Sequence, residues 1–535
     1  MSLVRNTATI GGLTLVSRVL GFVRDMLMAR FVGAGFASDA FLIAWRLPNL
    51  FRALFAEGAF AAAFVPMFNR PIAEAERGAE SGGDAAARRR AGLPAGLRFA
   101  EDVLSVLLPI LIVFTIVMML AAWPIVWAMT GGFRDGGPEK LALATEFTRI
   151  TFPYLMLISL VSLLGGILNS LGRFWVNAAA PVLLNICLIV GLMFFRGHSE
   201  IDTARTQSIA VTVSGVLQLG WLIWSCRQAG VVLRLKRPRL TPDVKKLLAI
   251  ILPAALGAGA VQFNLLISTT LAARFLPQGS VSYLYYADRL NQLPLGLIGI
   301  GVGTAILPLL SRQIGGGDDA AATATQNRAI ELSLLLTLPA TAALMVSAEP
   351  IIRALLQHGA FTVQDTAATA AALTAFSFGL PAYVLIKVLT PGFYARSDTR
   401  TPVRIALVAM GVNLVLNLAL VWPLAHVGLA VSTAISAWVN VGLLYLTLRR
   451  RDHFAADARL KARTLRLGAA TLAMAALLLA LNPLVDAYTA GPWLLRVVAL
   501  GAMMAAGAAT YFGAAFLFRA YNLAELRAQF TRRRA

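Results

Sequence analysis

Long apolar runs separated by short polar connections dominate the chain. Counted in windows long enough to cross a hydrocarbon layer of about 30 Å, they predict fourteen membrane-spanning helices. The first six lie at about 7–33, 38–68, 99–130, 140–170, 174–196 and 205–228. Six more lie at about 243–275, 281–312, 328–347, 365–394, 402–423 and 427–449, and a final pair at 463–484 and 491–520. The pattern therefore predicts an all-α polytopic membrane protein.

Composition and charge support a membrane protein and exclude a nucleic-acid-binding one. The chain is 58% hydrophobic and 14% charged, with a mean hydropathy of +0.73, which is too apolar for a soluble protein. Its net charge of +21 would suggest nucleic acid in a soluble chain. Here, however, Lys and Arg concentrate in alternate connections, as in the positive-inside pattern. We therefore expect both termini in the cytoplasm, and a cytoplasmic loop over the polar segment 72–96.

Catalytic and metal-binding motifs are missing from the sequence. Cys187 and Cys226 both lie in apolar spans, and the four histidines are scattered without HExxH or CxxC spacing. No GxxxxGK[ST] phosphate-binding loop is present. Every connection is too short to hold a catalytic domain, so we expect a transporter that is no enzyme and needs no cofactor or metal.

Charged residues interrupt the first two predicted spans. They are Arg18, Arg24, Asp25, Asp39, Arg46, Arg52 and Glu57. If the first helix enters the hydrocarbon near Ile10, Arg18 lies about 12 Å deep and Arg24 about 21 Å deep. A guanidinium stays charged at that depth, and placing it at the centre of a membrane helix costs about 2.5 to 3.5 kcal/mol. These residues are therefore expected to face a hydrated cavity, or alternatively Arg18 pairs with Asp25 while Arg24 or Arg52 reaches an interface.

Short matches in a common order indicate an internal repeat. Residues 29–31 (ARF) recur at 273–275, and Pro153 and Asn185 recur at a common offset as Pro381 and Asn413. The repeat unit is six spans, so both copies share one topology. We predict three parts: a cationic six-helix lobe at 1–232, a second lobe at 233–451, and an extra helix pair at 452–535.

The two lobes differ in charge. Carried along the repeat, Arg18, Arg24 and Asp25 fall opposite the neutral residues Gln262, Ser268 and Thr269. An anionic ligand held mainly by the first lobe would explain this asymmetry, and Arg289 adds a cation from the second lobe. Asn49, Asn264 and Gln262 are candidates for polar headgroup contacts, or equally bond neighbouring helices.

Several segments resemble the lipid II flippase family, MurJ or MviN. They are SRVLGFVRD, SDAF, RLPNLFR, FAEGAF, FVPMF, YYADRL, ILPLLS and PGFYARSDTRTP, which occur in the family's order over essentially the whole chain. The family shares a superfamily with the multidrug and toxin extrusion transporters. Its members move the undecaprenyl-pyrophosphate-linked disaccharide pentapeptide across the bacterial cytoplasmic membrane.

The resemblance also implies functional residues. Arg18, Arg24, Arg52 and Arg289 match the family's cavity arginines, Asp39 matches its required acid, and Asn49 belongs to a shared motif. Secondary candidates are Asp25, Arg46, Glu57 and Asp288. Where some members have Glu, this chain has Gln292, which puts any gating step that depends on that acid in doubt. The last two helices would form a groove for the lipid tail.

Prolines in two spans are candidate hinges. Pro48 and Pro66 lie in the second span and Pro294 and Pro308 in the eighth, where a missing N–H and a ring clash bend a helix. A static kink that only shapes a cavity is an equally good interpretation.

The sequence thus predicts a flippase for lipid II in the bacterial inner membrane, working by alternating access, with arginines on the pyrophosphate. The alternative is an ion-coupled multidrug exporter of the same fold, which should show unpaired buried acids. The expected partners are lipid II, membrane lipids and other cell-wall synthesis proteins. The energy source, either the membrane potential or a coupling ion, stays open.

Overall fold

The computed structural model describes residues 3–54, 60–78, 85–488 and 491–521, and the regular structure of these ranges is helical throughout. Ten helices in this described part are long and apolar enough to cross a membrane. In lipid each backbone N–H and C=O must be satisfied within its own segment, which is why apolar runs of this length form helices. The predicted all-α polytopic fold is confirmed.

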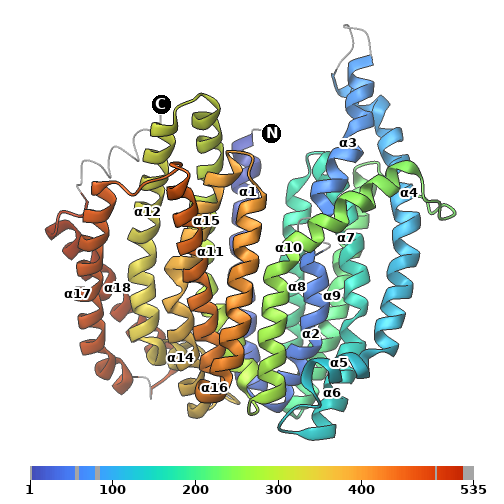
Figure 1. The fold of residues 1–535 in the computed structure, drawn as a ribbon. Coiled ribbons are helices and arrows are strands. Elements are labelled where there is room, and N and C mark those ends of the chain that lie inside the picture. The colour runs from blue at the N-terminus through green and yellow to red at the C-terminus, as the bar shows by residue number, and fades with distance from the viewer. Residues whose placement is uncertain (1–2, 55–59, 79–84, 489–490, 522–535) are drawn as a thin grey trace. The chain divides into compact units, whose positions relative to one another are not determined.

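The helices fall into two compact units, Met1–Gly279 and Ser280–Ala535. The first unit contains α1 (Leu3–Val32), α2 (Phe36–Leu54), α3 (Phe60–Gly78), α4 (Ala85–Leu120), α5 (Ala122–Thr130), α6 (Gly137–Thr151), α7 (Pro153–Ser170), α8 (Phe174–Phe194), α9 (Glu200–Gln228) and α10 (Pro242–Phe275). The second contains α11 (Ser280–Gly315), α12 (Asp319–Val346), α13 (Ala348–Leu356), α14 (Val363–Phe378), α15 (Leu380–Tyr394), α16 (Arg400–Arg450), α17 (Ala458–Tyr488) and α18 (Trp493–Leu517). Figure 1 shows both units.

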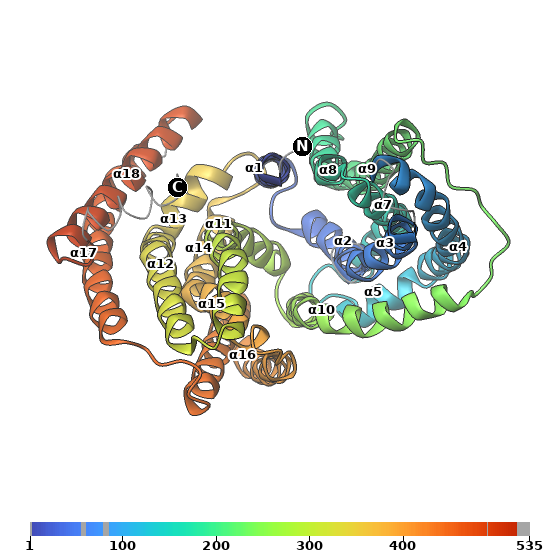
Figure 2. The ribbon, with the colours of Figure 1, turned by 90° about the horizontal axis from the view of Figure 1, so that it is seen from above.

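In the first unit, α1 packs along α8, α2 packs against α6, and α7 packs against α3 and α9. Helix α10 lies against α2, α3, α4 and α5 (Figure 2). The Phe64 ring stacks on Phe68 at 5.7 Å and on Phe99 at 5.6 Å between ring centroids. This buried aromatic cluster fixes α3 to α4.

In the second unit, α11 packs against α12, α14 and α15, whereas α17 packs on α12 and α18. The α17–α18 pair lies at the outer edge of this unit (Figure 2). Polar contacts attach the pair to α12: the Arg463 guanidinium donates to the Glu331 carboxylate at 3.0 Å, and the Tyr511 hydroxyl to the Leu335 carbonyl at 2.8 Å. Whether the pair holds a lipid tail stays a prediction.

Several predicted spans match helices whose ends lie close to the expected ones, but others are divided. The predicted span 140–170 consists of α6 and α7, which meet at Phe152 just before Pro153, where the proline ring removes a backbone donor. The 51-residue α16 would be about 75 Å long if it were straight, too long for one crossing. It kinks at Ala425, whose φ is 50°, between the two spans predicted at 402–423 and 427–449.

The segment 72–96 was wrongly predicted to be a loop. Helix α3 continues to Gly78 and α4 already begins at Ala85, and together they extend past the other helices of the first unit (Figure 1). Residues 72–78 and 85–96 are rich in Ala, Glu and Arg, which are among the strongest helix formers, so the described parts of the segment are helical.

The predicted lobe boundary near residue 232 differs from the boundary between the compact units at Gly279. The difference concerns α10, which packs on α2, α3, α4 and α5. A helix can belong to one repeat by sequence and still pack on the other, so the assignment of 233–451 to a second lobe stays a prediction.

Asp398, in the connection between α15 and α16, provides a test of local stability. It accepts hydrogen bonds from the Thr401 hydroxyl and amide at 2.6 and 3.0 Å and from the Arg451 guanidinium at 2.7 Å. The Thr401 and Arg451 contacts hold the pKa of the Asp398 carboxyl well below its usual range. The stabilisation is therefore present above about pH 4 and lost as the pH falls through the folded pKa.

We expect Asp398→Asn to lower the free energy of unfolding by about 1 kcal/mol at pH 7, as the loss of a helix cap does. The difference from the unchanged protein should shrink as the pH falls below about 4, in thermal melts followed in detergent. Asp243→Asn, an exposed acid in the first turn of α10, is the matched control. A difference that stays constant with pH would contradict this role of the carboxylate.

Candidate functional site

The deep charges of α1 are held by a network that reaches α8. Arg24 Nε and Nη2 donate to Asp25 Oδ1 at 3.0 and 2.6 Å, and Nη1 donates to Asn185 Oδ1 at 3.1 Å. Asn185 Nδ2 in turn donates to the Ser17 carbonyl at 2.9 Å. The side chains of Arg24 and Asp25 are only 13% and 4% exposed. Arg24, and not Arg18, therefore pairs with Asp25, and the network fixes α1 to α8.

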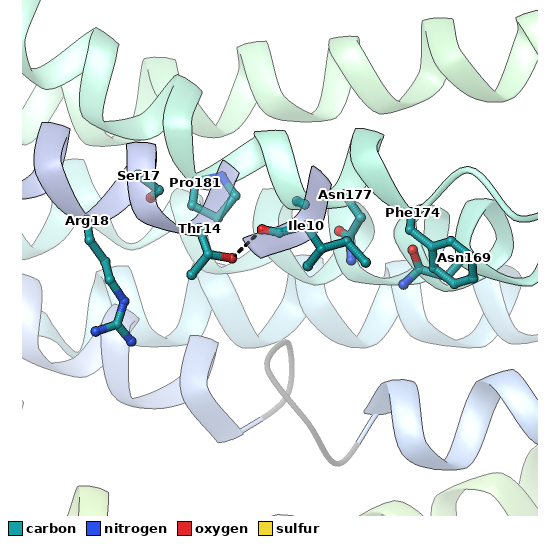
Figure 3. A pocket seen from close by; sticks show the side chains of 9 residues that line it. Ile10, Thr14, Ser17, Arg18, Asn169, Phe174, Asn177 and Pro181 are labelled. Atoms are coloured by element: carbon teal, nitrogen blue, oxygen red, sulfur yellow. Dashed lines mark hydrogen bonds between the residues drawn. The ribbon is translucent and has the colours of Figure 1, made fainter. Parts of the chain in front are cut away.

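Arg18 lines a groove on the same two helices. The groove has a volume of about 390 Å³ and is lined by Ile10, Thr14, Ser17, Arg18, Asn169, Phe174, Asn177, Ala178 and Pro181. In Figure 3 the Arg18 side chain lies at one end of this row. Within the described part of the chain, its exposed guanidinium has no hydrogen-bond or ion-pair partner. An unneutralised cation beside a groove is suited to binding an anion.

Two candidates of α2 contact each other. Arg52 Nε and Nη2 donate to Asn49 Oδ1 at 3.1 and 2.9 Å. Because the amide is neutral, this contact orients the guanidinium without cancelling its charge. Farther along α2, Arg46 Nη2 donates to the Leu265 carbonyl of α10 at 2.9 Å, so Arg46 joins two helices.

Asp39 lies at the opposite end of α2 from Arg52. Its carboxylate accepts hydrogen bonds from Lys140 Nζ at 2.9 Å and from the Gly279 amide at 2.8 Å, and it is 2% exposed. Lys140 is equally buried and lies 4.9 Å from the centroid of the Phe133 ring. Asp39 thus joins α2 to α6 and to the segment after α10. The sequence identified the acid but not Lys140, which is the first residue of the predicted span 140–170.

In the second unit the candidate residues lie on α11. Gln292 Nε2 donates to Asp288 Oδ2 at 2.5 Å, and Arg289 is half-buried beside them. Gln292, which stands where some family members have Glu, therefore contacts the neighbouring acid. A cation overlooked in the sequence, Lys387 of α15, packs its stem on Gly299. A Cβ at Gly299 would lie 3.0 Å from Lys387 Cδ, so the glycine allows close packing.

The remaining candidates have no direct part in these contacts. Glu57 lies outside the described residues. Pro48, Pro66, Pro294 and Pro308 lie inside α2, α3 and α11, and their role as hinges stays a prediction. Among the described residues, no group of three or more His, Cys, Asp or Glu side chains could hold a metal ion.

The fold defines the class of protein as an all-helical polytopic membrane protein. A solved structure of a multidrug resistance MATE family transporter of the MOP superfamily, in an inward-facing conformation, aligns with 82% of this chain and 98% of its own. The TM-score is 0.64 at 17% identity. A solved structure of the lipid II flippase MurJ in an inward closed conformation aligns with 94% of this chain and 98% of its own, with a TM-score of 0.72 at 22% identity.

Sequence comparison identifies the particular family. A family model described as "Lipid II flippase MurJ" matches residues 28–499. The "Probable lipid II flippase MurJ" of Rhizobium meliloti (strain 1021) is 43% identical, over 98% of this chain and 96% of its own length. The chain therefore belongs to the lipid II flippase MurJ family. It is a multi-pass membrane transporter, homologous to bacterial MurJ.

The network around Arg24 predicts a difference between two arginines of one helix. Arg24→Ala would remove the guanidinium that lies 2.6 Å from the buried Asp25 carboxylate, and breaking a buried ion pair costs about 3 kcal/mol or more. We expect a clear loss of thermal stability that Arg24→Ala combined with Asp25→Asn largely restores. Arg18→Ala, which breaks no ion pair among the described residues, is the control and should melt like the unchanged protein. Equal melting of Arg24→Ala and Arg18→Ala would contradict the assignment.

Proposed function

We propose that this chain moves lipid II from the cytoplasmic to the outer leaflet of the bacterial inner membrane by alternating access, with Arg18, Arg24, Arg52 and Arg289 binding the pyrophosphate headgroup. The observation that carries the proposal is the exposed Arg18 guanidinium of α1, which lies beside a polar groove and has no partner in the described part of the chain. A permanent cation in this place needs either water or an anionic ligand.

The hydrogen bonds of the arginines suggest that they contribute differently. No described residue bonds to the five N–H donors of Arg18, and the neutral Asn49 amide orients Arg52. Arg24 already donates to Asp25 and Asn185. We therefore assign the main pyrophosphate contact to Arg18, with Arg52 and Arg24 in supporting roles. Arg289 is assigned from the second unit by its match to the family motif.

The buried acids argue against the alternative of a multidrug exporter. An exporter of organic cations needs an unpaired acid within its binding cavity. Asp25 is paired with Arg24 and Asp39 with Lys140. Both carboxylates are neutralised locally, so the first unit offers an anion site in place of a cation site.

Orientation and energetics follow from the charge pattern. Arginines and lysines concentrate at one end of the helices, including Arg396, Arg449, Arg450 and Arg451, and we assign this end and both termini to the cytoplasm. A pyrophosphate moving outward then crosses an inside-negative potential in the favourable direction. The gain is about 2.3 kcal/mol per elementary charge per 100 mV.

We expect collapse of the membrane potential at constant pH gradient to slow lipid II export. Export would be followed as lipid II accessible from the outer face of cells that depend on this chain. The matched control collapses the pH gradient and spares the potential. Export that responds only to the control treatment would favour a proton-coupled mechanism and contradict a drive by voltage.

Arginine substitutions test the pyrophosphate site. Loss of the charge-assisted contact between Arg52 and the pyrophosphate should reduce the binding free energy of lipid II by about 2 kcal/mol, which is roughly thirty-fold in affinity. We expect Arg52→Ala to be inserted normally but unable to support growth when it replaces the cell's own flippase. Arg52→Lys keeps the charge without the planar fork and should restore growth in part.

Arg134→Ala is the matched control for Arg52→Ala, because Arg134 donates to the Phe275 carbonyl of α10 at 2.9 Å and is not a candidate for pyrophosphate binding. Protein level and melting temperature would be recorded for every variant. Normal growth with Arg52→Ala, or loss of growth in proportion to loss of protein, would contradict the proposed role.

A further inference from the structure

The groove beside Arg18 continues into a row of neutral polar side chains. Thr14 belongs to α1, Asn169 to the end of α7 and Asn177 to the start of α8, with the Phe174 ring beside Asn169 (Figure 3). Among the described residues that line this groove none is acidic, and Arg18 is the one cation. From Ile10 to Arg18 the row follows α1 for about 12 Å.

The amides of this row have unused hydrogen-bonding capacity. Among the described residues, neither the Asn169 nor the Asn177 side chain has a hydrogen-bond partner. Asn185 on the same helix differs, because its amide bonds to Arg24 and Ser17. Thr14 donates to the Ile10 carbonyl at 2.8 Å and keeps its oxygen free to accept. Polar groups at a helix interface normally find partners, so this row is open to water or to a polar ligand.

The neighbouring helix makes room for one of these amides. A Cβ at Gly165 of α7 would lie 2.4 Å from Asn177 Oδ1, closer than any real contact. Only glycine at this position lets Asn177 keep its place beside the groove. Phe174, at 36% exposure, presents an apolar ring beside the Asn169 amide (Figure 3).

We propose that this groove is a saccharide subsite, which binds the N-acetylated sugar next to the pyrophosphate. The inference rests on the proposed function. In a lipid-linked sugar pyrophosphate the first sugar is bonded directly to a phosphate, so it must lie within one sugar length of the arginine that holds that phosphate. Side-chain amides and a hydroxyl match sugar hydroxyls and an acetamido group, which both donate and accept. The Phe174 ring can cover the apolar face of a pyranose.

The neutral side chains of this row favour the saccharide over the stem peptide as their ligand. The stem peptide of the precursor carries carboxylates, which would need cations, and the described lining residues include no cation beyond Arg18. A neutral row therefore fits the saccharide and leaves the peptide elsewhere.

Two probes distinguish this subsite from the pyrophosphate site. Binding to the purified full-length chain would be measured for lipid II and for undecaprenyl pyrophosphate, which has no sugar. We expect Asn169→Ala combined with Asn177→Ala to weaken lipid II binding roughly thirty-fold, as the loss of two neutral hydrogen bonds implies, and to leave undecaprenyl pyrophosphate unchanged. Arg18→Ala should weaken both probes.

Further variants distinguish the loss of sugar contacts from a loss of folding. Gly165→Ala keeps both amides but displaces Asn177, and it should weaken lipid II selectively. Phe174→Ala should do the same, with Phe174→Tyr restoring binding. Ile186→Ala, on an exposed position of α8, is the matched control and should change neither probe.

Each outcome decides one of the two claims. Equal weakening of both probes by the double asparagine variant, or no weakening of either, would overturn the saccharide subsite. If the asparagine variants affect lipid II alone while Arg18→Ala affects neither probe, the subsite stands and the assignment of Arg18 to the pyrophosphate fails.

Discussion

The permanent charge of the guanidinium is the constraint on which the first unit depends. An arginine at membrane depth cannot lose its proton, so its charge must be paired or hydrated. Arg24 is paired: Asp25 neutralises it, and Asn185 carries the network on to the Ser17 carbonyl. Arg18, six residues earlier on the same helix, has no such partner in the described part of the chain. One helix thus carries both a structural arginine and an available one.

The contacts of Arg24 help to hold the groove beside Arg18 in shape. The Arg24 network holds α1 against α8, and the groove beside Arg18 is formed by the same two helices together with the end of α7. A groove between helices that are tied together keeps its shape without its ligand, which lowers the cost of ordering on binding. Asp39 and Lys140 also tie helices together. Their buried ion pair, near the start of α2, joins α2 to α6, and the Gly279 amide joins the segment after α10 to the same carboxylate.

The sequence predicted the elements set by long-range hydrophobicity and by the chemistry of single residues. Apolar length predicted the spans, including the break near Ala425, and the depth of Arg18 and Arg24 predicted that α1 would have a polar side. Contacts between distant segments could not be predicted in this way. Lys140 was hidden because a lysine near the start of a helix usually faces solvent. The role proposed for the Asn169 and Asn177 amides depends on their positions beside Gly165 and Arg18, which are distant in sequence or lie on other helices.

The central claim is that arginines of this chain bind the pyrophosphate while lipid II crosses the membrane. The most direct measurement is the fraction of lipid II exposed on the outer leaflet of cells in which this chain replaces the native flippase. Exposure would be scored by an added enzyme that cleaves lipid II only from outside. The account predicts wild-type exposure with the unchanged chain and almost none when Arg18 and Arg52 are both replaced by glutamine in a normally inserted protein. Wild-type exposure with that double variant would contradict it.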